Sequence, residues 1–258
     1  MASFTVENLE FLLAILARLS GFIFTAPIYS LRNVPVRGKL LVSVAVAVIV
    51  YIATPYTPLV YAGVIGYAAV ISKELISGLI LGLFANLAYY ILGFAGQLID
   101  MEVGLSNVQE LDPSSNMSVT ISSTFLNYGA MLTLISTNMH LFILKAVIDS
   151  FSIVPVNGLK VDSNIFYLYL KYMADYMIIA FRIVLPEFAA MLIVNTLLAI
   201  LAKVAPQLSM FVIGFQLKIF VGITVLVLMM IMLPGISDMI FNNMIENMKN
   251  AIEYMGGS

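Results

Sequence analysis

The stretch "GLILGLFANLAYYILGFAGQLID", residues 78–100, decides the fold class. Small and polar residues recur in it at steps of three or four positions, which is the spacing of one helical face. These residues are Gly78, Gly82, Asn86, Tyr89, Gly93, Gln97 and Asp100. Because apolar side chains fill the remaining positions, the pattern predicts a membrane helix with one packed face. Extended back to Gly66, the helix would be about 50 Å long, more than a bilayer core of roughly 30 Å requires.

Gly78 and Gly82 form a GxxxG pair within this stripe. Two helix backbones can approach closely at such a pair, because no side chain separates them. The sequence therefore predicts a helix-packing site at these two glycines.

The composition supports a chain that is solvated by lipid or by partner proteins. Of its 258 residues, 62% are hydrophobic and 10% are charged, and the mean hydropathy is +1.04. An ordinary soluble domain has roughly 25% charged residues, and a soluble fold of this composition would expose large apolar patches. We therefore predict an all-α integral membrane protein.

Several function classes are excluded by residue counts. The net charge of −2 gives no electrostatic basis for binding nucleic acid. The absence of cysteine removes disulfides, thiolate nucleophiles and zinc–thiolate sites, and a single histidine leaves no His-based metal site. No Walker-type loop or nucleophile elbow is present, so we predict a non-enzymatic protein with no cofactor.

The apolar segments are separated by turn residues and prolines. They run over residues 9–28, 40–72 with a break at 54–58, 66–99, 122–148, 165–203 with an interruption at Pro186, and 210–233, where Pro234 is expected to end the helix. The remaining residues to Ser258 form a mildly amphipathic tail. The basic cluster at residues 32–39 is the clearest cytoplasmic signal under the positive-inside rule.

Seven charged residues lie within or beside the apolar segments. They are Arg18, Lys73, Glu74, Arg182, Glu187, Lys203 and Lys218. A charge at the centre of a membrane helix costs on the order of 2.5–3.5 kcal/mol on insertion scales, so each needs a compensating environment. Two explanations remain open from the residues alone. The charges line an aqueous or proton pathway, or they pair across helices and are buried by partner proteins.

Residues 104–120, "GLSNVQELDPSSNMSVT", form a long polar segment between two apolar runs. Connections in compact domains have a median of about 4–6 residues, and longer ones tend to be functional or disordered. The segment is either a solvent-exposed loop or non-helical backbone at membrane depth inside a water-filled cavity. The acids at positions 100, 102, 110 and 112 do not have the spacing of a compact calcium loop.

Five stretches carry a family resemblance. They are "ARLSGFIFTAPIYSLRNVPVRGKLLVSVAVA" (17–47), "KELISGLILGL" (73–83), "GQLIDMEVGLSNVQELDPSSN" (96–116), "NMHLFILKAVIDSFSIVP" (138–155) and "LPEFAAMLIVNTLLAILAKVAPQLSMFVIGFQLKI" (185–219). In this order they resemble the R subunit of the bacterial flagellar export gate, the FliR family, which is homologous to the T subunit of virulence type III secretion systems. Ser209, Gln216 and Lys203 depart from the residues usual at their positions.

The resemblance implies a multi-pass subunit of an export gate in the bacterial inner membrane, within the flagellar basal body. Its partners would be the P and Q subunits, the B subunit, the large A subunit and exported unfolded proteins. It also implies one membrane domain over 1–258 with tilted and broken helical hairpins. A P-like part (1–164) would precede a Q-like hairpin and amphipathic tail (165–258).

The same resemblance implies a role for the polar segment. Residues 104–120 would be a plug that projects into the closed pore. The plug residues expected to matter are Gly104, Ser106, Asn107, Asp112, Pro113, Ser114 and Asn116. The alternative function is a small-solute or ion-coupled secondary transporter, in which Arg18, Glu74, Arg182 and Glu187 would converge. Inverted repeats would favour that alternative, and the sequence does not display them.

Overall fold

The protein is described by a computed structural model that covers residues 5–30, 34–105, 121–160, 164–207 and 210–256. Within these ranges all regular secondary structure is helical, which confirms the predicted fold class. The helices are α1 (Val6–Thr25), α2 (Val36–Ala53), α3 (Gly63–Val103), α5 (Ile121–Ser136), α6 (Met139–Ile153), α7 (Asn164–Val204) and α8 (Met210–Gly256). The long helix predicted around residues 66–99 is α3, with 41 residues.

Five helices, α1, α2, α3, α7 and α8, are long and apolar enough to cross a membrane. Helices α5 and α6 pass the same criterion only as a pair, because each alone is too short. This set of apolar helices makes the chain a multi-pass membrane protein.

The helices belong to two compact units. Unit 1 contains residues 1–88, 138–173 and 241–258, and unit 2 contains residues 89–137 and 174–240. Each of α3, α7 and α8 contributes residues to both units. Each unit contains residues from both 1–164 and 165–258. The units therefore do not test the division into a P-like and a Q-like part, which stays a prediction.

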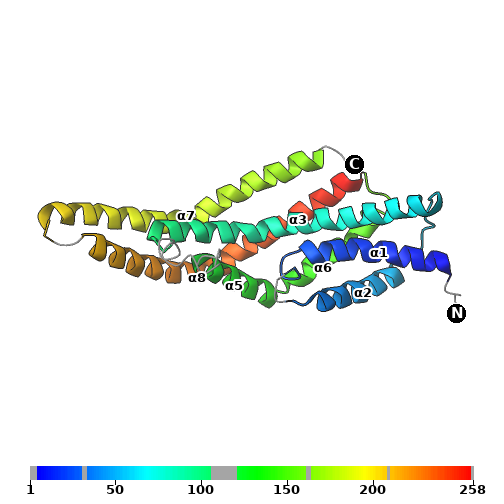
Figure 1. Ribbon diagram of the computed structural model, residues 1–258, viewed down its shortest axis with the longest axis horizontal. Helices are drawn as coiled ribbons and strands as arrows, with labels where there is room; N and C mark the ends of the chain where they lie inside the picture. Colours follow the sequence, from blue (N-terminus) through cyan, green and yellow to red (C-terminus); the bar gives the residue numbers. More distant parts are fainter. Residues whose placement is uncertain (1–4, 31–33, 106–120, 161–163, 208–209, 257–258) are drawn as a thin grey trace. The chain divides into compact units, whose positions relative to one another are not determined.

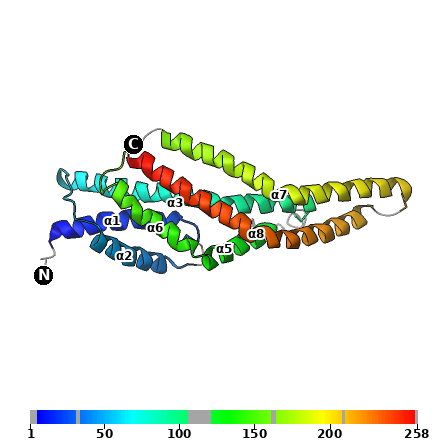
Figure 2. The same ribbon diagram turned by 180° about the vertical axis from the view of Figure 1, so that it is seen from behind.

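In unit 1, α1 lies beside α2 and along the first half of α3 (Figure 1, Figure 2). Most of its buried residues are apolar, with Phe11, Ile15 and Leu19 inaccessible to solvent. Glu7 in the first turn favours the helix, because a negative charge complements the positive end of the helix dipole. The helix ends at Thr25, since Ala26 is extended and precedes Pro27.

The predicted GxxxG pair contacts α1 of the same chain. A Cβ atom on Gly78 would overlap the carbonyl oxygen of Arg18, and one on Gly82 would overlap the side chain of Thr25. From the opposite side, a Cβ on Gly21 would lie 2.6 Å from the carbonyl oxygen of Leu75. The backbones of α1 and α3 are therefore as close as glycine permits.

The structure has one break that the sequence did not predict and lacks two that it did. The apolar run 122–148 is divided at Asn138, whose left-handed φ of 57° separates α5 from α6, a conformation that asparagine tolerates. Conversely, α7 continues through Pro186, and α8 continues through Pro234 to Gly256. Proline is tolerated inside membrane helices, where neighbouring groups satisfy the freed carbonyl. The break predicted at residues 54–58 is present.

The α1–α3 contact predicts an asymmetry between two glycines of unit 1. Gly78→Ala should destabilise the protein by about 1–3 kcal/mol, because the added methyl group forces the two backbones apart. Gly38→Ala is the matched control, since its Cβ would meet its nearest neighbour at 3.7 Å, an ordinary contact. The measurement is the thermal unfolding midpoint of each variant in detergent. Equal midpoints for the two variants would show that the close approach is unimportant.

Candidate functional site

Only the first of the predicted plug residues falls in the described part of the chain. Gly104 follows α3 directly and has a φ of 91°, a left-handed conformation that favours glycine. Its N–H donates to the carbonyl of Asp100 at 3.1 Å, which ends the helix. Ser106, Asn107, Asp112, Pro113, Ser114 and Asn116 lie outside the described residues.

The two ends of the polar segment are joined in unit 2 by a carboxylate. Asp100 lies near the end of α3, and its Oδ2 atom accepts a hydrogen bond from the Ser122 N–H at 3.1 Å. The carboxylate also accepts a hydrogen bond from the Ser122 hydroxyl. Ser122 is the second residue of α5, where backbone N–H groups have no partner within the helix. The carboxylate therefore caps α5, and its charge is favourable at the positive end of that helix.

Gly96 allows this junction to form. A Cβ on Gly96 would overlap the backbone of Ser123 and lie 2.8 Å from the carbonyl carbon of Ser122. Because the glycine lacks that atom, the start of α5 rests directly on α3, one turn before Asp100. We call Gly96, Asp100, Ser122 and Ser123 the clasp. All polar members of the clasp are buried.

A second buried carboxylate lies at the same end of α3. Glu187 of α7 is fully buried, and neither of its oxygens has a hydrogen-bond partner among the described residues. It packs against Gly222 of α8, where a Cβ would lie 3.2 Å from its Oε1 and 2.8 Å from Cγ1 of Val103. The last turn of α3, α7 and α8 therefore meet at one carboxylate, directly before Gly104.

Unit 1 contains a buried ion pair that joins α1 to α3. The Arg18 Nε donates to Glu74 Oε2 at 2.7 Å, and both side chains are completely buried. The remaining Arg18 donors reach the carbonyl of Val154 at 2.9 Å and the hydroxyl of Ser150 at 3.3 Å. Glu74 also accepts the N–H of Asn157 at 2.9 Å. The pair thus fixes the end of α6 and the turn that follows it.

The other predicted charges have different environments. Lys73 donates to Asn157 Oδ1 at 3.3 Å on the surface of unit 1. Arg182 and Lys203 are exposed and Lys218 is half-buried, and none of the three makes an ion pair within the described ranges. Their pairing, if partners supply it, stays a prediction. No cluster of three metal-ligating side chains occurs in the part of the chain that the structure describes.

The sequence identifies the charged residues of the clasp and of the buried ion pair, but not the uncharged residues that bind them. Asp100, Arg18 and Glu74 were selected by their position on apolar helices. Their partners Ser122, Ser150 and Asn157 were missed, because a serine or asparagine near a helix end is too common to be a signal. The two serines preceded by Ile121 are the one usable cue, since serine is frequent at helix starts.

Comparison with known proteins gives consistent matches over most of the chain. Residues 9–244 match the family model described as "Bacterial export proteins, family 1". The flagellar biosynthetic protein FliR of Buchnera aphidicola (subsp. Acyrthosiphon pisum) is 30% identical over 239 residues, covering 89% of this chain and 92% of the relative. FliR of Escherichia coli K12 is 28% identical (92% and 90% covered), and FliR of Bacillus subtilis 168 is 29% identical (95% and 96% covered).

The buried ion pair predicts non-additive effects of substitution. Arg18→Met and Glu74→Met should each cost about 3–5 kcal/mol, because each leaves an uncompensated buried charge. The double variant should recover most of that loss, since both charges are removed together. Unfolding midpoints in detergent test this. A double variant as unstable as the sum of the single variants would contradict the pairing.

The clasp predicts local loosening at the start of α5. Asp100→Ala should remove about 1 kcal/mol of capping energy and speed amide exchange in residues 121–127 roughly fivefold. The control is Asp175→Ala, which removes an exposed acid from α7. Hydrogen–deuterium exchange followed by mass spectrometry provides the measurement. Unchanged protection of residues 121–127 in the Asp100 variant would show that the clasp is not needed there.

Proposed function

We propose, on the premise that this chain belongs to the FliR family of bacterial export proteins, that it helps to form a pore through which unfolded flagellar proteins cross the inner membrane. The family makes the chain a component of the flagellar export apparatus. The proposal goes beyond family membership in three respects, which are the pore, the plug and the named partners. The role is one of structure and gating, without a catalytic step.

The clasp is the observation that best supports a plug. It joins α3 to α5 through Asp100 and Ser122, so the described residues on either side of the polar segment are held close together. A polar segment held at both ends can fill an aqueous lumen and move aside without disturbing the helices that carry it. Its composition suits that role, because it is polar and contains no basic residue.

The P and Q subunits are proposed as the partners that complete the pore. The chain leaves many large apolar side chains exposed on α2, α7 and α8, such as Leu41, Ile193 and Ile231. Lipid or partner helices must cover these faces. The exposed Arg182 and Lys203 favour partner proteins over lipid for part of this surface, because an unpaired charge among apolar side chains is costly.

The transporter alternative gains no support from the described residues. Arg18 and Glu74 are bound to each other in unit 1, and their remaining hydrogen-bonding groups reach backbone or serine. Arg182 and Glu187 belong to unit 2. A substrate would have to break the buried ion pair to use either of its members. No second function is therefore proposed.

The plug predicts a leak on deletion. Removing residues 106–116 should leave the complex assembled but make proteoliposomes that contain it permeable to potassium ions. The control replaces the same residues by a Gly-Ser segment of equal length, which retains bulk in the lumen and should leak less than the deletion. Native mass spectrometry establishes that each variant is assembled with its partners. An assembled deletion complex that leaks no more than the unaltered one would refute the plug.

A further inference from the structure

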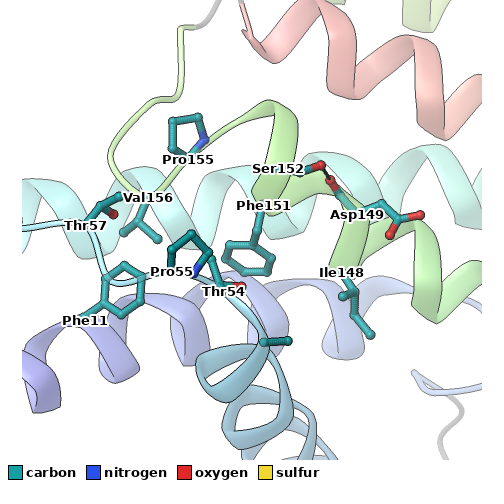
Figure 3. A pocket seen from close by; sticks show the side chains of 11 residues that line it. Phe11, Thr54, Pro55, Thr57, Ile148, Asp149, Phe151, Ser152, Pro155 and Val156 are labelled. Carbon is teal, nitrogen blue, oxygen red and sulfur yellow. Dashed lines mark hydrogen bonds between the residues drawn. The ribbon is translucent and has the colours of Figure 1, made fainter.

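Unit 1 contains a half-open cleft of about 490 Å³ (Figure 3). Its 11 lining residues come from α1, from the end of α2 and the connection after it, and from the end of α6 and the turn that follows. Ligand pockets in proteins typically have volumes of roughly 300–1,000 Å³, so the cleft is large enough for a ligand. Neither the two residues of the ion pair nor those of the clasp are among its lining residues.

The walls of the cleft are apolar and held in place. They include the rings of Phe11 and Phe151 together with Pro55 and Pro155. The Arg18 guanidinium lies 4.2 Å from the centre of the Phe151 ring, and one of its nitrogens reaches the carbonyl of Pro155 at 3.5 Å. The buried ion pair therefore fixes one wall of the cleft, and the site exists before any ligand arrives.

Three polar side chains of the lining are unused. The hydroxyl groups of Thr54 and Thr57 and the carboxylate of Asp149 make no hydrogen bond or ion pair with any described residue. Figure 3 shows Asp149 and Ser152 on one side of the cleft, and Phe11 and Thr57 on the other. The cleft thus offers one negative charge and two hydroxyl groups beside its apolar walls.

Part of the backbone between α2 and α3 also lacks a hydrogen-bond partner among the described residues. Thr54 is extended, with φ −97° and ψ 131°, and both Thr54 and Thr57 precede a proline, which favours extended backbone. Residues 55–62 form neither helix nor strand. The N–H groups of Tyr56 and Thr57 donate to no described residue. Such a segment can pair with an extended peptide as the edge of a sheet does.

The charges around the cleft favour a cation. Asp149 lines it, and Glu7 lies one helical turn before Phe11 on α1. Glu10 accepts a hydrogen bond from the Tyr61 hydroxyl at 2.5 Å, which raises the pKa of Tyr61 to about 12 and keeps that side chain neutral. None of the lining residues is basic.

None of the nearby basic residues lines the cleft. Arg18 is neutralised by Glu74, whereas Lys73 keeps its charge and donates a hydrogen bond to Asn157. Lys145 lies one turn before Asp149 on α6 and makes no ion pair with it. Asp149 is therefore the charged side chain that lines the cleft, and no basic side chain lines it.

We propose that this cleft binds an extended polypeptide segment in which a large apolar side chain stands next to Lys or Arg, and that the segment belongs to an unfolded protein in export. The apolar side chain enters between Phe11 and Phe151, the basic group reaches Asp149, and the peptide backbone pairs with residues 56–57. This inference rests on the proposed function for the source of the peptide, but its chemistry rests on the cleft alone.

The size of the cleft favours a transient ligand over a resident subunit. Stable protein–protein interfaces bury about 800 Å² per partner and involve roughly 20–30 residues on each side. The 11 residues of the cleft supply about half of that number at most. A passing chain needs only a weak site, whereas a permanent subunit needs a larger surface.

Peptide binding to the purified export complex in detergent tests the chemistry. The probe is a fluorescein-labelled nonapeptide with a central Phe-Lys pair and otherwise Ser and Thr, and the comparison peptide has Phe-Glu in its place. Fluorescence anisotropy should show tighter binding of the Phe-Lys peptide than of the Phe-Glu peptide. Asp149→Asn should weaken that binding about two- to fivefold, the range of a surface ion pair.

Two matched variants separate backbone pairing from side-chain contact. Thr57→Pro removes a backbone N–H as well as the hydroxyl, whereas Thr57→Val removes the hydroxyl alone, so Thr57→Pro should weaken binding more than Thr57→Val does. Asp175→Asn controls for the loss of an exposed acid in unit 2. Equal binding of both peptides, or binding indifferent to Asp149→Asn and Thr57→Pro, would overturn the proposal.

A cross-linking experiment identifies the source of the peptide. A benzophenone amino acid at position 57 should cross-link, in cells, to an exported protein stalled by a folded carboxyl-terminal fusion. Cross-links to a resident subunit instead would make the cleft an assembly contact and refute the export assignment. Neither result depends on the ion leak that tests the plug, so the two proposals can fail separately.

Discussion

The buried ion pair between Arg18 and Glu74 is the constraint on which unit 1 depends. Two charges in an apolar interior are tolerable only when each is fully compensated. Here Arg18 also donates to the carbonyl of Val154 and Glu74 also accepts the N–H of Asn157, so compensation reaches beyond the two helices. Because those groups follow the end of α6, the ion pair determines where α6 stops as well as how α1 meets α3.

Close packing of α1 on α3 and the ion pair require each other. Gly78 lies against the backbone of Arg18 itself, so any larger residue there would displace the guanidinium from Glu74, one turn earlier on α3. The helices approach because glycine permits it, and the approach brings the charges within 2.7 Å. The same charges hold Phe151 and Pro155, which makes the cleft of unit 1 a consequence of helix packing.

The helical spans, the glycine face of α3 and the importance of Arg18, Glu74 and Asp100 could be predicted from the sequence. The glycines, the charged residues and the aspartate stand within apolar runs, and such residues can be recognised from the sequence alone. The partners of these residues could not be predicted, because Ser122, Ser150 and Asn157 are ordinary residues until the fold brings them near. The helix breaks predicted at Pro186 and Pro234 were wrong because they depend on the surroundings. A proline breaks a helix in water, but not where neighbouring helices satisfy the freed carbonyl.

The buried carboxylates of the described residues have two kinds of environment. Glu74 and Asp100 each accept a backbone N–H from a residue beyond their own helix, and each thereby fixes a connection. Glu187 is as deeply buried as they are but has no such donor among the described residues. A buried carboxylate without a donor is costly, and this one lies against Gly222 and the contact that Gly222 makes with Val103. Movement of the last turn of α3 that admits water to Glu187 would reduce that cost, whereas no comparable relief exists at Glu74. The last turn of α3 therefore combines a satisfied carboxylate, Asp100, with a contact of Val103 near the unsatisfied Glu187, whereas the crossing of α1 and α3 has both of its charges paired.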